Sequence, residues 1–204
     1  MGLRESKMKV LIACEESQEV CKAFRRLRHE AYSCDILSCS GGYPKWHIQD
    51  DVLKHLNEGW DLMIAHPPCT YISNAGARHL YPKKVLNLQR KAKGDIATLF
   101  FMRLYNCDIP KICVENPIPS KIYGLPQYSQ IIHPFEYGHK YKKATCLWLK
   151  NLPLLKPTKI VDLRESTKVP GNWFNKGGKD RQKNRAKTFK GIAEAMARQW
   201  TRKV

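Results

Sequence analysis

Short apolar segments alternate with segments of helical periodicity along the chain, and this alternation limits the folds that it can adopt. Four apolar runs predict buried strands: Met8 to Ala13, Ala31 to Asp35, the run that ends at Cys69 and the run from Lys111 to Glu115. Between them we expect helices from Ser17, as the N-cap, to Arg28 and over Lys84 to Tyr105. This order predicts an α/β fold whose mostly parallel sheet is covered by helices on both faces.

The pattern changes after Pro117, where prolines interrupt short extended pieces. Residues 131–137 and 144–149 predict later strands, which could run antiparallel, and residues 188–200 predict a closing amphipathic helix. Residues 151–187 are rich in Pro, Gly, Asn and Lys with little periodicity, so we expect a basic loop or a minimal target-recognition segment there. With 204 residues and no internal repeat, the chain suits one domain that covers residues 1–204.

Cys69 directly follows Pro67 and Pro68 at the end of the third apolar run. The prolines stiffen this exit from the sheet, because each fixes φ near about −65° and lacks an amide donor. The next apolar run ends in Glu115 and Asn116. A lone cysteine is more often a buried small hydrophobic residue than a nucleophile, but the prolines and the paired acid and amide favour catalysis by Cys69. Because parallel strands share one carboxyl edge, we expect the thiol and the acid to meet there.

A thiol and a carboxyl group at one sheet edge suit chemistry on a pyrimidine ring. A thiolate can add to carbon 6 while Glu115 protonates or hydrogen-bonds ring nitrogen 3, and carbon 5 then becomes nucleophilic toward a methyl donor. A base in duplex DNA must first be flipped out of the stack, and the loop from Ser73 to Arg78 is a candidate for this step, with Asn74 and Arg78 as DNA contacts. This reasoning leaves cytosine and uracil open, and also DNA, RNA and a free nucleotide.

Positive charge is concentrated in the last third of the chain. The formal net charge is +18, and residues 138–204 hold 18 lysines and arginines against four acids. Such concentration favours contact with a phosphate backbone over the alternative of a basic surface without a polyanionic partner. The residues that we expect to touch phosphates are Lys142, Lys143, Arg181 and Arg185. Nucleic acid is therefore the expected partner.

These motifs together resemble the DNA cytosine-5 methyltransferases, and most closely their short relatives in phages and prophages. Pro67-Pro68-Cys69 is similar to the Pro-Cys nucleophile motif of that family, and Glu115-Asn116-Pro117 is similar to its Glu-Asn-Val motif. Residues 142–148 resemble the basic strand that follows, and residues 191–193 resemble the final motif. The resemblance covers most of the chain and implies a Rossmann-like methyltransferase fold with S-adenosylmethionine as the donor and double-stranded DNA as the partner. It also implies Cys69 as the nucleophile, Glu115 as the ring-nitrogen partner and Asn116 as the residue that fixes this acid and its loop.

The resemblance further implies where the cofactor would lie. Asp35, at the end of the second strand, would bind the ribose hydroxyls, and Asp50 or Asp51 would meet the adenine amino group. The full set of implied cofactor contacts is Cys14, Glu15, Glu16, Asp35, Asp50, Asp51, His66 and Pro67. Members of the family usually carry a glycine-rich turn after the first strand, whereas the loop from Ala13 to Gln18 has no glycine.

Two other functions stay open at this point. An exocyclic-amine DNA methyltransferase also uses a double-proline strand end, but it normally has Asp, Asn or Ser in place of His66 and an aromatic residue in place of Cys69. The other alternative is a basic nucleic-acid-binding module that kept the fold and lost catalysis. The sequence shows no metal-ligand spacing, signal peptide or membrane-length apolar run, so we expect a cytoplasmic protein without a metal and with reduced cysteines. It makes no prediction of the oligomeric state.

Overall fold

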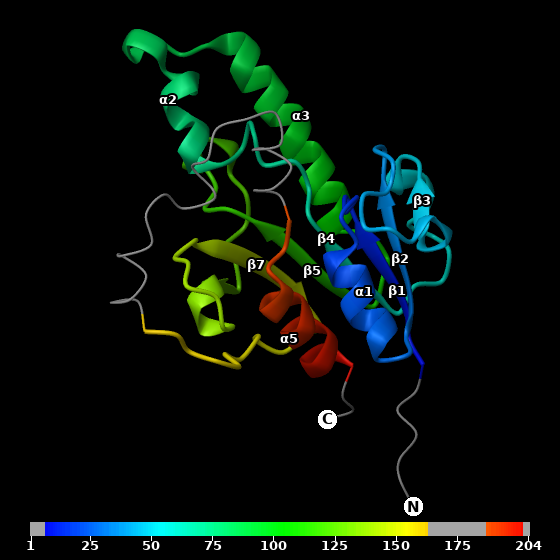
Figure 1. Cartoon of the computed structure of the whole chain (residues 1–204). Coiled ribbons are helices and arrows are strands. Elements are labelled where there is room, and N and C mark those ends of the chain that lie inside the picture. The colour runs from blue at the N-terminus through cyan, green and yellow to red at the C-terminus, as the bar shows by residue number, and fades with distance from the viewer. Residues whose placement is uncertain (1–6, 163–186, 202–204) are drawn as a thin grey trace, which may run out of the picture.

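A seven-stranded sheet lies at the centre of the computed structural model, which describes residues 7–162 and 187–201 (Figure 1). Its strands are Lys9–Ala13 (β1), Glu30–Asp35 (β2), His47–Gln49 (β3), Leu62–Ala65 (β4), Lys111–Asn116 (β5), Gln130–Ile132 (β6) and Thr145–Lys150 (β7). They are ordered β3-β2-β1-β4-β5-β7-β6. Neighbours from β3 to β5 run parallel, whereas β7 runs antiparallel to both β5 and β6. This order, with its reversed β7, confirms the expected α/β class and is consistent with a Rossmann-like methyltransferase fold.

Helices cover both faces of the sheet. α1 (Glu19–Arg26) and α5 (Lys190–Trp200) pack against each other on one face, and α3 (Leu88–Tyr105) packs on the other (Figure 1). The short α2 (Ala77–Leu80) precedes α3. Single turns of 3-10 helix lie in the connections, at Pro44–Trp46, Val52–Lys54, Asn74–Gly76, Pro82–Lys84, Lys121–Tyr123 and Pro134–Glu136.

Alternate residues of the central strands fill two separate cores. Val10 and Ile12 of β1 pack with α1 and α5, whereas Leu11 and Ala13 pack on the face that α3 covers. All four side chains are fully buried, as expected for an inner strand of a sheet covered on both faces. Each large aliphatic side chain buried in this way contributes ~1.5–3 kcal/mol. The sheet is therefore a firm support for residues at its carboxyl edge.

The strand that precedes the thiol is shorter than expected. β4 ends at Ala65, four residues before Cys69. The amide of His66 still donates to the last carbonyl of β1, at 2.9 Å, but Pro67 and Pro68 have no amide to continue the ladder. Cys69 therefore lies on a loop beyond the sheet and not at the strand end itself.

Two helices also begin at other residues than expected. α1 takes Gln18 and not Ser17 as its N-cap residue. α3 begins later than the expected Lys84, because the side chain of Asn87 accepts a hydrogen bond from the Arg90 amide at 3.0 Å and caps the helix there. The two late strands are confirmed as antiparallel, although both are shorter or shifted. Residues 151–162 follow β7 without a helix or strand, and residues 163–186 of the expected loop lie outside the described part of the chain.

Candidate active site

The carboxyl ends of β1, β4 and β5 meet where the winding of the sheet reverses. From β1 the chain winds toward β3 on one side, and from β4 it winds toward β5 on the other. Ala13 pairs with Ala65, and Ala65 pairs with Val114, so the three strand ends lie side by side. Open α/β sheets bind ligands beyond the carboxyl ends of their strands at such a switch point. The loops after β1 and β4 and the end of β5 therefore form the candidate site.

His66 and Glu115 form a buried pair at this point. The distance from Nδ1 of His66 to Oε2 of Glu115 is 3.0 Å, and the side chains are 8% and 16% exposed. Burial by itself would raise the pKa of Glu115, but the hydrogen bond with His66 and the charge of Lys143 outweigh it and lower this pKa. Burial by itself would lower the pKa of His66, but Glu115 and the nearby Glu15 outweigh it and raise this pKa. The pair therefore holds one proton over a wider pH range than either group would alone.

Asn116 connects the acidic strand end to the loop that carries the thiol. Its Nδ2 donates to the carbonyl of Pro67 at 3.0 Å, and the residue is 1% exposed. Cys69, two residues further on, is partly exposed and is not part of either core. The structure thus places Glu115 and Asn116 at the end of β5 and Cys69 on the loop after β4, and the bond from Asn116 to the Pro67 carbonyl joins the two segments.

Two buried polar atoms of the site have no hydrogen-bond partner within residues 7–162 and 187–201. They are Nε2 of His66 and Oδ1 of Asn116. A buried polar atom without a partner costs about 1–3 kcal/mol, so most such atoms in proteins are satisfied. One is a potential donor and the other an acceptor, and both are available to a polar ligand group at the switch point.

The loop after β1 has the backbone of a tight glycine turn without containing glycine. Cys14 and Gln18 both have a φ of 59°, in the left-handed region that favours glycine. The amides of Cys14 and Glu15 both donate to the carbonyl of Cys34, at 2.7 and 3.3 Å. The chain therefore makes a close turn here with residues other than glycine.

Glu15 closes the N-terminus of α1. Its buried carboxylate accepts hydrogen bonds from the amides of Val20, at 2.7 Å, and Cys21, at 3.2 Å. Glu15 thus satisfies the helix amides that we expected Ser17 to cap. A ligand phosphate at this helix would meet the charge of Glu15, so the usual dinucleotide phosphate site is not available. The loop instead suits a neutral or cationic ligand.

Asp35 and Asp51 border the same loop. Asp35 ends β2 and accepts a hydrogen bond from the Leu37 amide at 2.9 Å. Burial raises the pKa of the Cys14 thiol, and the charges of Asp35 and Asp51 raise it further, so both carboxylates lie close to Cys14. Asp51 also accepts a hydrogen bond from the Leu53 amide at 3.0 Å and caps a turn of 3-10 helix.

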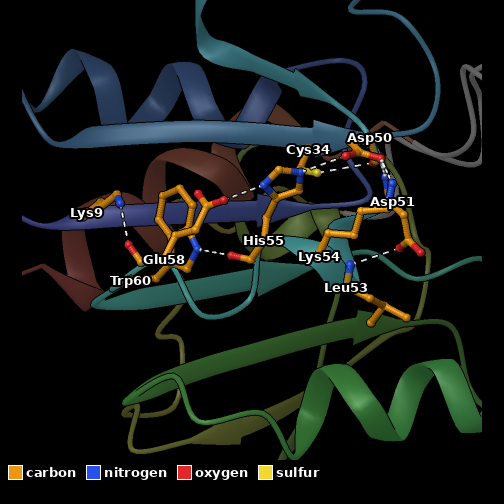
Figure 2. Close-up of polar contacts among 9 residues, drawn as sticks. All are labelled: Lys9, Cys34, Asp50, Asp51, Leu53, Lys54, His55, Glu58 and Trp60. Atoms are coloured by element: carbon orange, nitrogen blue, oxygen red, sulfur yellow. Dashed lines mark hydrogen bonds and ion pairs between the residues drawn. The ribbon is translucent and has the colours of Figure 1, made fainter.

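Asp50 lies in a polar network that also contains Asp51, whose amide donates to the Asp50 carboxylate at 2.7 Å (Figure 2). Its carboxylate contacts Nζ of Lys54 at 2.8 Å and Nε2 of His55 at 3.3 Å, and His55 also contacts Glu58 at 2.6 Å. Both oxygens of Asp50 thus have partners, and of the two acids expected at the adenine Asp51 is the more available. Glu16 is partly exposed and accepts a hydrogen bond from the Ser40 hydroxyl.

Gln18 is a site residue that the sequence analysis did not identify. Its fully buried side chain donates to Ser33 Oγ at 3.2 Å and bonds both the carbonyl and the amide of Tyr43, at 2.9 and 3.1 Å. A Cβ at Gly41 would lie 2.5 Å from the Cβ of Gln18, which explains the glycine there. Gln18 therefore fastens the loop after β2 to the turn after β1. A buried glutamine has no signal in a single sequence.

The residues expected to contact nucleic acid follow Cys69 or precede β7, whereas most of the expected cofactor contacts lie after β1 to β3. Asn74 and Arg78 are exposed on the segment that follows Cys69, and Lys142 is exposed before β7. Lys143 is partly buried and lines a small hollow together with Glu115. Arg181 and Arg185 lie outside the described residues. Acidic groups thus border the site at β1 to β3, and basic groups border it beyond β4 and β5.

Within the described ranges, no helix is long and apolar enough to cross a membrane. The same part of the chain contains no group of three or more His, Cys, Asp or Glu side chains that could hold a metal ion. All eight cysteines carry free thiols, as expected.

No protein-family model matches this chain, and no curated protein matches it. One solved structure to which the chain is similar is a prophage-encoded protein of Escherichia coli that has been assigned as a DNA modification methyltransferase. The two share 12% sequence identity with a TM-score of 0.48, over 76% of this chain and 52% of the other. This chain therefore spans about half the length of that structure.

Proposed function

We propose that this protein is a DNA methyltransferase that transfers a methyl group from S-adenosylmethionine to carbon 5 of cytosine. The observation that carries the proposal is the connection between the Pro67-Pro68-Cys69 loop and the end of β5. Asn116 bonds the carbonyl of Pro67, and Glu115 bonds His66, which immediately precedes the prolines. A nucleophile and an acid held in this way from two strand ends suit an aromatic ring bound between them.

In this proposal Cys69 attacks the pyrimidine. Its thiolate forms a bond to carbon 6, and carbon 5 gains the electron density needed to accept a methyl group. S-adenosylmethionine, when bound, would supply that methyl group as an electrophile from its sulfonium and leave as the thioether S-adenosylhomocysteine. The carbon 5 proton then leaves to solvent and the Cys69 sulfur departs, which restores the aromatic ring and the free thiolate.

Glu115 and His66 hold the proton that this sequence needs. One proton is shared by the pair, and ring nitrogen 3 takes it from Glu115 as the sulfur adds to carbon 6. The same proton returns to the pair when the sulfur leaves. His66 thus acts through Glu115 and serves as a positioning residue that holds the shared proton beside this carboxylate.

The residues at the carboxyl ends of β1 to β3 fit S-adenosylmethionine. Asp35 is suited to the ribose hydroxyls and Asp51 to the adenine amino group, and both lie near the left-handed turn at Cys14. Glu15 and its neighbouring acids suit a cofactor with a cationic sulfonium and no phosphate. The unpaired Asn116 Oδ1 and His66 Nε2 offer further polar contacts to cofactor or base.

The exocyclic-amine alternative is less compatible with this site. That chemistry needs an acceptor for the amine hydrogen in place of His66, but Nδ1 of His66 is taken up by Glu115. It also needs a stacking ring in place of Cys69, which has none. No feature of the described residues favours the non-catalytic alternative, and the product assay below separates all three.

The test is to incubate the protein with methyl-labelled S-adenosylmethionine and mixed-sequence DNA and to identify the labelled base. We expect label in 5-methylcytosine, none with Cys69→Ser, and wild-type label with Cys107→Ser, a control at another partly exposed cysteine. Label in N-methylated bases would overturn the proposal in favour of the exocyclic-amine reaction. The absence of label despite DNA binding would favour the binding module.

A further inference from the structure

A cavity of about 430 Å³ opens beside the thiol loop, on the segment that contains α2 and the start of α3. In Figure 1 this segment projects beyond the sheet. The residues that matter among its lining are Tyr71, Arg78, His79, Asn87, Arg90 and Lys93. None of the cofactor contacts expected from the sequence lines this cavity, so it is distinct from the cofactor side of the site.

The described residues give this cavity a positive charge and do not neutralise it. They contribute two arginines, a lysine and a histidine to its lining, and no Asp or Glu. Among the described residues, no carboxylate forms an ion pair with Arg78, Arg90 or Lys93, whereas the neighbouring Lys91 pairs with Asp95 at 2.8 Å. Unneutralised cations gathered around one hollow favour an anion as the ligand.

The positions of these cations favour a phosphate group over a stacked base. Arg90 and Lys93 both lie over the ring of Tyr71, at 5.1 and 5.8 Å from its centroid. A base could stack on this ring only by displacing a cation–π contact. A guanidinium held against an aromatic ring still presents its remaining N–H groups to phosphate oxygens.

Arg90 also connects the cavity to the thiol loop, which carries Cys69. Its Nη2 donates to the carbonyl of Thr70 at 2.9 Å, and Thr70 is the residue after Cys69. The backbone amide of Arg90 is fixed by Asn87 at 3.0 Å. An anion that binds Arg90 therefore acts on a side chain that already holds the thiol loop.

We propose that this cavity binds backbone phosphates of the DNA strand beside the target nucleotide. The inference rests on the proposed function for the identity of the nucleic acid, but its residues are separate from Cys69, Glu115 and the cofactor side. Contact with the phosphates through Arg78, Arg90 and Lys93 sets the register of the strand. Arg90 then binds both a phosphate and the Thr70 carbonyl, so it links the strand to the thiol loop.

The test measures the affinity for a fluorescent DNA duplex at several salt concentrations for wild type, Arg78→Gln and Lys93→Gln. Arg78 makes no described contact with the thiol loop, and Lys93 contacts it only at the ring of Tyr71, so both variants should fold, which a thermal melt checks. The control is Arg26→Gln, an exposed arginine at the end of α1, near the start of β2 and away from the carboxyl edge of the sheet, that loses the same charge. We expect each cavity variant to bind DNA about 3- to 10-fold more weakly than wild type. The slope of log binding constant against log salt concentration should be smaller in magnitude by about 1, and the control should match wild type in both quantities.

If the cavity variants bind DNA no more weakly than Arg26→Gln does, the proposal is overturned. Inorganic phosphate, titrated against chloride at equal ionic strength, distinguishes the source of the anion. Displacement of DNA from wild type and not from Lys93→Gln supports a shared phosphate site, and phosphate binding with no effect on DNA overturns it. If the cavity variants bind DNA as wild type does and wild type still produces labelled 5-methylcytosine, only this inference is refuted. If the cavity variants bind DNA more weakly but wild type methylates no cytosine, only the proposed function is refuted.

Discussion

The imidazole of His66 lies 3.0 Å from the carboxylate of Glu115 and also faces the buried carboxylate of Glu15. Glu15 follows β1, His66 follows β4 and Glu115 lies in β5, so this histidine joins the ends of three strands. A single proton is thereby held at the centre of the proposed catalytic site. The first two predictions concern this proton.

Replacing His66 by Gln should move the alkaline limb of the pH–rate profile to lower pH. In wild type the shared proton is lost as the pH rises through the raised pKa of His66. In the variant Glu115 must hold the proton alone, and a carboxyl group releases it at lower pH than this histidine does. The measurement is kcat from about pH 5 to about pH 9. An alkaline limb that stays where it is in wild type would show that His66 does not hold the proton.

The same variant should change how stability depends on pH. The contribution of Glu115 to the free energy of unfolding is fully present above its ordinary pKa of 4.5, and it is lost as the pH falls through its lowered pKa in the folded protein. The contribution of His66 is present below its ordinary pKa of 6.5 and is lost as the pH rises through its raised folded pKa. His66→Gln should therefore cost most between pH 4.5 and 6.5, by about 3 kcal/mol, and less at higher pH.

Urea unfolding at several pH values measures this cost. His79→Gln, at an exposed histidine on α2, is the control and should show no such dependence. A cost for His66→Gln that is the same at every pH would mean that the side chain contributes packing and not charge.

The sheet was predictable because local patterns carry most of its information. β1, β2 and β5 coincide with strands predicted from the sequence, β2 and β5 end in the polar residues Asp35 and Asn116, and the helices between the strands fix the parallel order. The exit of the chain at Pro67 and Pro68 was also predictable, although the end of β4 was placed too late. Proline signals where a ladder stops only to within a few residues.

The contacts within the site were less predictable because they depend on the register in which the strands pair and on the backbone conformation of the loops. Glu115 and His66 are 49 residues apart, and only the pairing of β4 with β5 brings them together. The left-handed turn at Cys14 and Gln18 has no sequence signal, because the residues that usually mark it are glycines. The roles expected of Asp35, Asp51 and the basic residues stay predictions.

Replacing Glu115 by Gln should lower turnover far more than DNA affinity. The amide oxygen can still accept a hydrogen bond from His66, but the side chain can no longer transfer a proton to ring nitrogen 3. We expect kcat to fall by about 100-fold or more, with the dissociation constant for DNA within about threefold of wild type. Equal, large losses in both quantities would indicate that Glu115 is structural.

Cys14 should tolerate glycine and reject a β-branched residue. Its φ of 59° is open to glycine but strained for valine. Cys14→Gly should retain affinity for S-adenosylmethionine, and Cys14→Val should lose about 10-fold or more, as measured by titration calorimetry. Equal affinities for the two variants would show that the cofactor does not depend on this turn.

Covalent trapping tests the central claim most directly. Wild type is incubated with S-adenosylmethionine and mixed-sequence DNA in which 5-fluorocytosine replaces cytosine, and the products are separated under denaturing conditions. We predict a stable protein–DNA adduct with wild type and Cys107→Ser and none with Cys69→Ser. An adduct that persists in Cys69→Ser, or no adduct when wild type measurably binds both DNA and cofactor, would contradict the account.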